Sequence, residues 1–88
     1  MPVVFRYKGI RFFFFSNEGE PREPVHIHVD GAEGDAKFWL QPSVILEDSY
    51  GFDARALREL KRVVEDNADL IERAWNEHFN DDRQISPL

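Results

Sequence analysis

The sequence predicts an α+β fold, in which a small antiparallel sheet of four to five strands precedes one long C-terminal amphipathic helix. The first half alternates apolar and polar residues with the period of a strand, in runs separated by glycine-containing turns. The second half repeats apolar residues every three to four positions from Ala54 to Phe79, which is the period of a helix. Residues 1–79 are therefore expected to form a single α+β domain, and residues 80–88 a polar C-terminal tail.

Residues 3–7 and 10–15 predict a first hairpin, because Lys8-Gly9 is a two-residue connection that contains a glycine. If Tyr7 pairs with Ile10, alternation divides the side chains between two faces. The face expected to point to the core holds Val3, Phe5, Tyr7, Ile10, Phe12 and Phe14. The other face holds Val4, Arg6, Arg11, Phe13 and Phe15.

Residues 25–30 and 35–40 predict a second hairpin around Gly31–Gly34. Pairing Asp30 with Asp35 gives a core face of apolar residues only: Val25, Ile27, Val29, Ala36, Phe38 and Leu40. The opposite face carries His26, His28, Lys37 and Trp39, with His28 opposite Lys37 and His26 opposite Trp39. Residues 44–46 are expected to add a short edge strand.

The helix is expected to begin after Asp53, a residue type that caps helix N-termini. Its apolar stripe consists of Leu57, Leu60, Val64, Ala68, Ile71, Ala74 or Trp75, and His78 or Phe79. This stripe is expected to pack on the Val25/Ile27/Phe38/Leu40 face of the sheet. We expect one helix with a bend at Asn67; two helices broken at Asn67 are the alternative, with Asp69 as a second cap.

Composition excludes several classes of protein. The 88 residues include no cysteine, so disulfides and thiolate chemistry are absent, and no run approaches the roughly 20 apolar residues of a membrane span. A cytoplasmic protein without membrane association is expected. The net charge of −6 is uneven, with five Lys and Arg against six Asp and Glu up to Leu46 and six against eleven after it. This argues against attraction of the whole protein to nucleic acid.

Several motifs resemble an uncharacterised bacterial family, described as domain of unknown function 4160. They are Arg11-Phe12-Phe13-Phe14-Phe15, Glu23-Pro24-Val25-His26-Ile27-His28-Val29, Ala36-Lys37-Phe38-Trp39-Leu40, Gly51-Phe52 and Ala74-Trp75-Asn76-Glu77. Members usually show two prolines before the first histidine, whereas Pro24 here is followed by Val25. The family has no established activity. The resemblance implies a small gene that lies beside the gene of a second small uncharacterised protein, an arrangement suggestive of toxin–antitoxin pairs. It thus implies a protein that acts with this partner, and RNA or DNA as the ultimate target.

His26 and His28 are the sharpest chemical feature. Residues two apart on a strand point the same way, so the two imidazoles are able to converge on a divalent metal. No third ligand is fixed by spacing; Asp30 and Asp35 share the face, and Glu33 or a carboxylate of residues 18–23 could join. Without a metal, the histidines would stack on Trp39 or bond to loop carbonyls.

The same histidines are candidates for catalysis. His26 and His28 would serve as base and acid, Lys37 would stabilise the transition state, and Arg6 and Arg11 would hold phosphates. Phe13 and Trp39 would stack bases. This pattern is typical of a metal-free ribonuclease, or of a phosphodiesterase if a metal is bound. The alternative is that these are solvated or packed side chains, and whether the protein is an enzyme stays open.

The interpretation we favour is an interaction module. Phe13, Phe15 and Trp39 would form a large apolar patch if nothing covered them. A homo-oligomer, or a complex with an acidic or helical partner, would cover it. We therefore expect a small bacterial interaction protein, one component of a toxin–antitoxin-like pair, that works through the His26/His28/Lys37/Trp39 face. Arg6, Arg11, Phe13 and Trp39 are its candidate binding residues.

Overall fold

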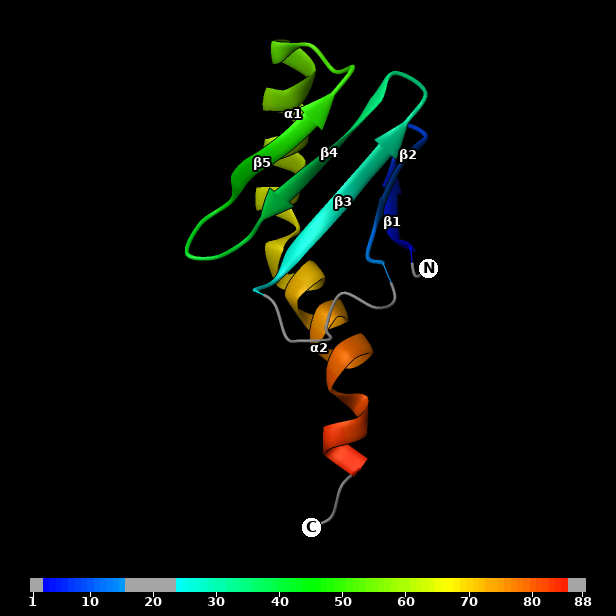
Figure 1. Ribbon diagram of the computed structural model, residues 1–88, viewed down its shortest axis with the longest axis vertical. Helices are drawn as coiled ribbons and strands as arrows, with labels where there is room; N and C mark the ends of the chain where they lie inside the picture. Colours follow the sequence, from blue (N-terminus) through cyan, green and yellow to red (C-terminus); the bar gives the residue numbers. More distant parts are fainter. Residues whose placement is uncertain (1–2, 16–23, 86–88) are drawn as a thin grey trace.

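The computed structural model describes residues 3–15 and 24–85, which form a five-stranded sheet with two helices on one side (Figure 1). The elements are β1 (Val3–Tyr7), β2 (Ile10–Phe13), β3 (His26–Gly31), β4 (Gly34–Trp39), β5 (Ile45–Tyr50), α1 (Ala54–Asp66) and α2 (Ala68–Ile85). The strands lie side by side in chain order, and every neighbouring pair is antiparallel. The predicted α+β class and antiparallel sheet are confirmed.

The first hairpin turns at Lys8 and Gly9, whose φ angles of 51° and 79° are both positive. Two such residues form the type I′ turn that matches the twist of paired strands. The predicted pair of Tyr7 with Ile10 is confirmed. Lys8 is not a residue type that favours this region, so Gly9 supplies the conformational freedom at the turn.

The predicted alternation of β1 is wrong at its first residues. The register shifts between Val3 and Phe5, so Val3 lies opposite Phe13 and is exposed. Val4, expected on the other face, packs against the core instead. An extra residue in one strand reverses the alternation of side chains, and a strict period of two does not reveal it.

The second hairpin has the predicted register throughout. Asp30 pairs with Asp35, and Ile27 with Phe38. The predicted edge strand is present as β5, although it is longer than expected and runs from Ile45 to Tyr50. Its register also shifts, between the partners of Lys37 and Phe38.

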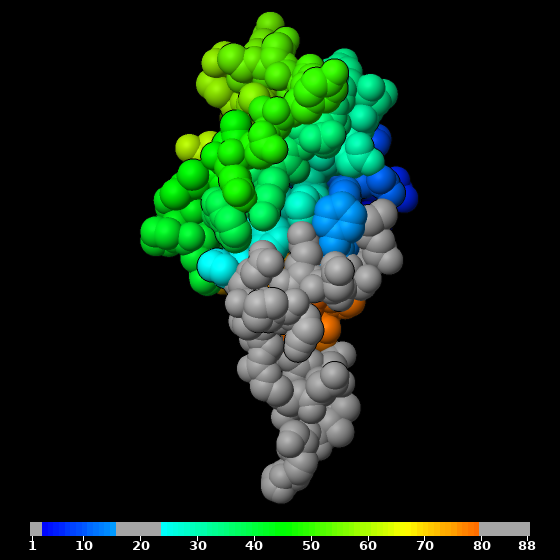
Figure 2. Space-filling view, in the orientation of Figure 1, coloured from blue at the N-terminus to red at the C-terminus, as the bar shows by residue number. Residues whose placement is uncertain are grey.

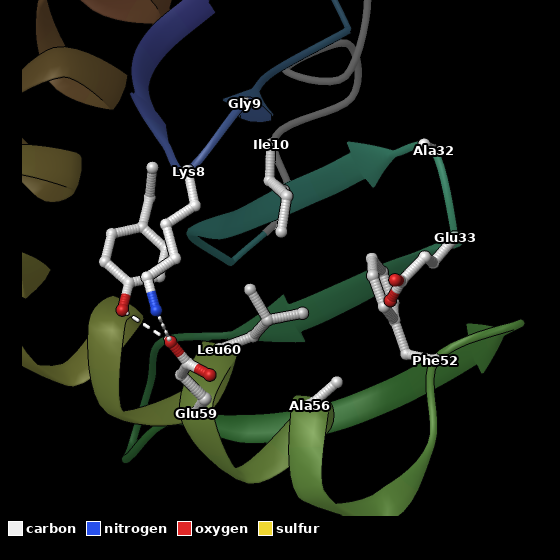
Figure 3. A pocket seen from close by; sticks show the side chains of 10 residues that line it. Lys8, Gly9, Ile10, Ala32, Glu33, Phe52, Ala56, Glu59 and Leu60 are labelled. Carbon is white, nitrogen blue, oxygen red and sulfur yellow. Dashed lines mark hydrogen bonds and ion pairs between the residues drawn. The ribbon is translucent and has the colours of Figure 1, made fainter.

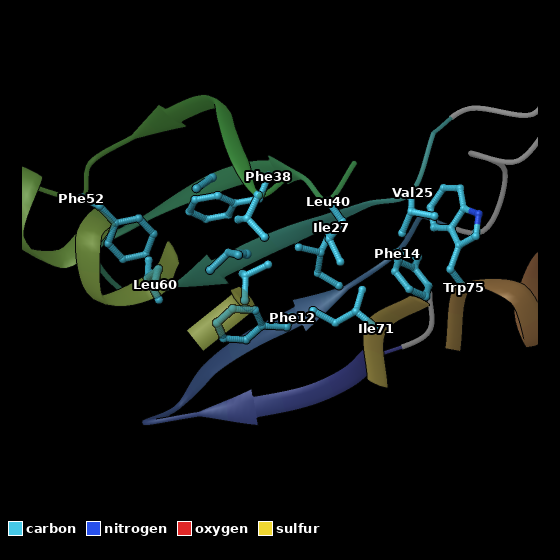
Figure 4. Close-up of a cluster of buried hydrophobic side chains, with 14 residues drawn as sticks. Phe12, Phe14, Val25, Ile27, Phe38, Leu40, Phe52, Leu60, Ile71 and Trp75 are labelled. Carbon is cyan, nitrogen blue, oxygen red and sulfur yellow. The ribbon is translucent and has the colours of Figure 1, made fainter. Parts of the chain in front are cut away.

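The core lies between the sheet and the helices (Figure 4). Phe12, Ile27 and Phe38 on the sheet are fully buried. The predicted helical stripe faces them, and its buried members are Leu60, Val64, Ile71 and Trp75. The periodicity did not decide whether Ala74 or Trp75 belongs to the stripe. Trp75 is buried, whereas Ala74 is only partly buried.

One continuous helix was the wrong prediction, and the alternative of two helices is correct. Asn67 lies between α1 and α2 with φ −115° and ψ 19°, outside helical geometry. Its side-chain Nδ2 donates to the carbonyl of Val63 at 2.8 Å, so the amide competes with the backbone for that acceptor. Asp69 lies within the first turn of α2 and not at its cap. Asp53 does cap α1, since its Oδ1 accepts from the Ala56 N–H at 2.8 Å.

α2 continues past the end of the sheet (Figure 1). Its last residue is Ile85, so residues 80–85, expected in the tail, are helical. Both helices lie on the same face of the sheet, which leaves the other face without a helix in the part of the chain that is described. No helix among these residues is long and apolar enough to cross a membrane.

Candidate functional site

The face of the sheet that points away from the helices, called the open face from here on, is the candidate site (Figure 2). Residues directly opposite each other on antiparallel strands share a face, so the register identifies its members. They are Val3, Arg6, Arg11, Phe13, His26, His28, Asp30, Asp35, Lys37, Trp39, Ile45, Asp48 and Tyr50. The four binding residues predicted from the sequence, Arg6, Arg11, Phe13 and Trp39, are all on this face.

His28 lies within a cluster of aromatic rings. Its ring stacks on Phe13, with centroids 5.6 Å apart, and meets Phe15 edge-on at 4.5 Å. Phe13 and Phe15 also contact each other, at 5.2 Å. Phe13 is buried, whereas 43% of Phe15 is exposed. His28 is therefore held between a structural phenylalanine and an accessible one.

His26 is buried more deeply than His28. It is fully buried, and its ring lies 5.1 Å from Trp39 and 5.0 Å from Trp75 of α2. Its Nδ1 is 3.0 Å from the carbonyl oxygen of Pro24. Since a carbonyl oxygen only accepts, Nδ1 is the donor in this contact. These contacts match the structural role considered for His26, namely stacking on Trp39 and bonding to a loop carbonyl.

Each of two cations on the open face is fixed by a ring and a carboxylate. Arg11 lies over Phe13, 5.2 Å from the ring centroid, and forms an ion pair with Asp30. Lys37 lies 4.4 Å from the centroid of Trp39, and its Nζ is 3.2 Å from Glu47. Both cations are therefore already neutralised by protein groups.

A groove of about 600 Å³ crosses the open face from β2 to β5. Its lining includes the cations Arg11 and Lys37 and four carboxylates, those of Asp30, Asp35, Glu47 and Asp48. The groove thus carries an excess of negative charge alongside Phe13 and Phe15. A ligand that complements it would bring positive charge and flat or apolar groups.

The sequence interpretation missed Glu47 and Asp48 as site residues. Both line the groove although they are consecutive in β5, because the register shift lets adjacent residues face the same side. Residues 45–50 show no alternation that could have signalled this. The contact of Trp75 with His26 was also missed, since it joins two elements far apart in the sequence.

The metal site stays a prediction, for which the described residues supply two neighbouring candidate ligands, His26 and His28. The rings of His26 and His28 are 5.3 Å apart and nearly perpendicular, at 85°. Among the described residues, no group of three or more His, Asp and Glu side chains is placed to hold a metal ion. Asp30 is engaged by Arg11, and Glu33 lines a different hollow, between the β1–β2 turn and α1. Residues 18–23, expected to contribute a carboxylate, lie outside the described residues.

Comparison with known proteins gives one match. A family model described as domain of unknown function (DUF4160) matches residues 9–76, a span that contains β2–β5, α1 and the first half of α2. Searches of curated proteins and of solved structures find no match.

Proposed function

Since the chain belongs to the DUF4160 family, whose description gives no activity, we propose from its geometry that it is an interaction module whose open face binds a basic partner protein. We further propose that this partner is the second component of a toxin–antitoxin-like pair, as the family resemblance implies. The observation that carries the proposal is the groove, in which the exposed ring of Phe15 stands beside four carboxylates and only two cations.

Exposed apolar groups on the open face support a protein interface. Phe15, Ile45 and Tyr50 are 43%, 46% and 78% exposed, and the half-buried Trp39 lies opposite Ile45. Aromatic residues are enriched at protein interfaces, where they bury a large area with few rotatable bonds. The free energy of binding would come mainly from covering these side chains.

The charge of the groove favours a basic partner and disfavours an anionic one. A partner arginine is able to stack on an aromatic ring and bond to a carboxylate at the same time. An RNA phosphate would instead meet four carboxylates, with Arg11 and Lys37 already paired. We therefore propose a basic partner in place of the acidic one considered from the sequence, because Glu47 and Asp48 belong to the open face.

The same charges disfavour a second copy of this chain as the occupant. Two open faces placed against each other would bring carboxylates of Asp35 and Asp48 close to like charges. Like charges opposed across an interface cost several kcal/mol. A different chain with Arg or Lys at these positions fits the groove better.

The enzyme alternative rests on His26, His28 and Lys37, and the geometry supports it less well. The histidine rings are close enough to act on one group, at 5.3 Å, but His26 is fully buried and Lys37 is paired with Glu47. A base and an acid for RNA cleavage must both reach the substrate. Cleavage of RNA by the purified chain that His28→Ala abolishes would favour the enzyme over the interaction module.

The test is co-purification of this chain with the protein encoded by the adjacent gene. The double variant Asp35→Lys/Asp48→Lys places positive charge in the groove and should weaken the complex roughly 100-fold. The matched control is Glu65→Lys/Asp66→Lys, which makes the same change of charge at exposed positions of α1 and should leave the affinity within about threefold. No complex, or equal weakening by both variants, would contradict the proposal.

A further inference from the structure

The outer surface of α1 carries a second feature, which the open face does not explain. Four basic residues, Arg55, Arg58, Lys61 and Arg62, lie in the first nine residues of this helix, and all four are exposed. We infer that this basic stripe of α1 binds the phosphate backbone of a nucleic acid. The inference goes beyond the proposed function, since it concerns a different surface and a different ligand.

Helical spacing puts three of these side chains in one row. Arg55, Arg58 and Arg62 are related by three and four residues, so they lie one above another on the same face. That face is opposite the buried residues Leu60 and Val64. At 1.5 Å per residue the row spans roughly 10 Å, about the axial rise of three phosphates on one strand of a duplex.

The one acidic residue within the stripe is compensated by groups outside it. Glu59 accepts from the Tyr7 hydroxyl at 2.5 Å and from the Lys8 ammonium at 3.0 Å, and Figure 3 shows Lys8 meeting Glu59 beside the turn. Both hydrogen bonds lower the pKa of Glu59, and the bond from Tyr7 has the larger effect. Lys8 therefore offsets the negative charge of Glu59. The next acidic residues of α1 are Glu65 and Asp66, which follow the four cations of the stripe.

The stripe also lacks the groups that another anionic partner would need. A membrane surface helix buries an apolar face in the lipid, but the apolar face of α1 is turned to the core through Leu60 and Val64. An acidic protein partner would need an apolar centre to its interface, and the grooved surface along the stripe is lined mostly by charged side chains, with only Tyr7 and Val63 otherwise. Arginines in a row with few apolar neighbours suit a phosphate backbone, to which they donate bidentate hydrogen bonds.

The position of the stripe separates it from the open face. α1 packs on one side of the sheet and the open face is the other side (Figure 1). In a protein of net charge −6, binding through the stripe depends on a local field and so should be weak and sensitive to salt. A basic partner on the open face and a nucleic acid on α1 would not compete.

The test is fluorescence anisotropy with two labelled probes of arbitrary sequence, a 20-base-pair duplex DNA and a 20-nucleotide RNA, in about 50 mM salt. Two probes are used because both present the same phosphodiester chemistry, and their relative affinity identifies the preferred form. Arg58→Gln/Arg62→Gln should lower the affinity for the preferred probe at least about tenfold. It should also reduce the slope of log affinity against log salt by about two, since two phosphate contacts are lost.

The matched control is Arg73→Gln, which removes one positive charge from an exposed position off the stripe and is compared with the single variant Arg62→Gln. It should change the affinity less than about threefold. Circular dichroism of each variant verifies that the fold is retained. Absence of binding by the unmodified chain, or an equal loss in Arg62→Gln and Arg73→Gln, would overturn the inference. Stronger binding to vesicles of anionic lipid than to either probe, lost on Arg58→Gln/Arg62→Gln, would also overturn it.

Discussion

The ammonium group of Lys37 lies 4.4 Å from the centroid of the Trp39 ring, on the face of the sheet opposite α1 and α2. Residues two apart on a strand share a face, so this contact follows directly from the sequence. The pairing of Lys37 with Glu47 does not, because it depends on β5. The two contacts together make Lys37 a fixed part of the groove rather than an available cation.

The two phenylalanines beside His28 should behave differently when truncated. Phe13 is 5% exposed and Phe15 is 43% exposed. Phe13→Ala should therefore lower the free energy of unfolding by about 3–5 kcal/mol, as for other buried phenylalanines, and Phe15→Ala by about 1 kcal/mol. Urea unfolding followed by circular dichroism measures both. Equal costs would contradict the assignment of Phe13 to structure and Phe15 to the accessible surface.

Docking of α2 on the sheet depends on Ile71, which is fully buried, and not on its neighbour Leu70, which is 40% exposed. Ile71→Ala should cost about 2–5 kcal/mol of unfolding free energy because it leaves a cavity. Leu70→Ala is the matched control and should stay within about 1 kcal/mol. If Leu70→Ala were the more damaging change, the helix would face the sheet with its other side.

Gly34 marks a close approach between two turns. A Cβ atom at this position would lie 2.0 Å from the carbonyl oxygen of Tyr50, a backbone atom that cannot swing away. Gly34→Ala should cost on the order of 3 kcal/mol. Gly9 has a φ of 79° and nothing within 4 Å of such a Cβ, so Gly9→Ala should cost only the strain of the left-handed conformation, about 1–2 kcal/mol. Thermal or urea unfolding gives the ranking, and the reverse order would contradict it.

The contact of Glu59 with Tyr7 and Lys8 should make stability depend on pH. The hydrogen bonds from Tyr7 and Lys8 lower the pKa of Glu59 from the ordinary value of 4.5. The stabilisation that they provide is therefore complete above pH 4.5 and is lost as the pH falls through the lower pKa of the folded state. Glu59→Gln should therefore destabilise the protein at pH 7, and this difference should shrink at pH 3. Glu65→Gln, on the same helix without these contacts, is the control. A difference that stays constant with pH would contradict the contact.

The fold was predictable where local pattern and long-range contacts agree. In β3 and β4 alternation alone gives the register, because any shift by one residue would place His28 or Lys37 in the core in place of Ile27 or Phe38. Val3 and β5 were not predictable in this way. Bulges there reverse the alternation, and the sequence carries no separate sign of them.

The end of α1 was left open because two local preferences compete at Asn67. The apolar period continues through this residue, whereas its amide is able to bond to the Val63 carbonyl and terminate the helix. The burial of His26 depends on Trp75 of α2, and a contact so distant in sequence has no local signal. Thus the pattern identified the open-face residues of β2, β3 and β4, but not those of β5, nor how far each side chain is accessible or how its charges are paired.

The most direct measurement of the central claim is an NMR titration of the isotope-labelled chain with the protein encoded by the adjacent gene. The chain has two tryptophans, Trp39 on the open face and Trp75 in the core, so their indole N–H signals provide a probe and an internal control. Binding at the open face predicts large shifts for the Trp39 indole and for the amides of Glu47 and Asp48, with α1 unchanged at Arg58. Shifts confined to α1, or no shifts at all, would contradict the account.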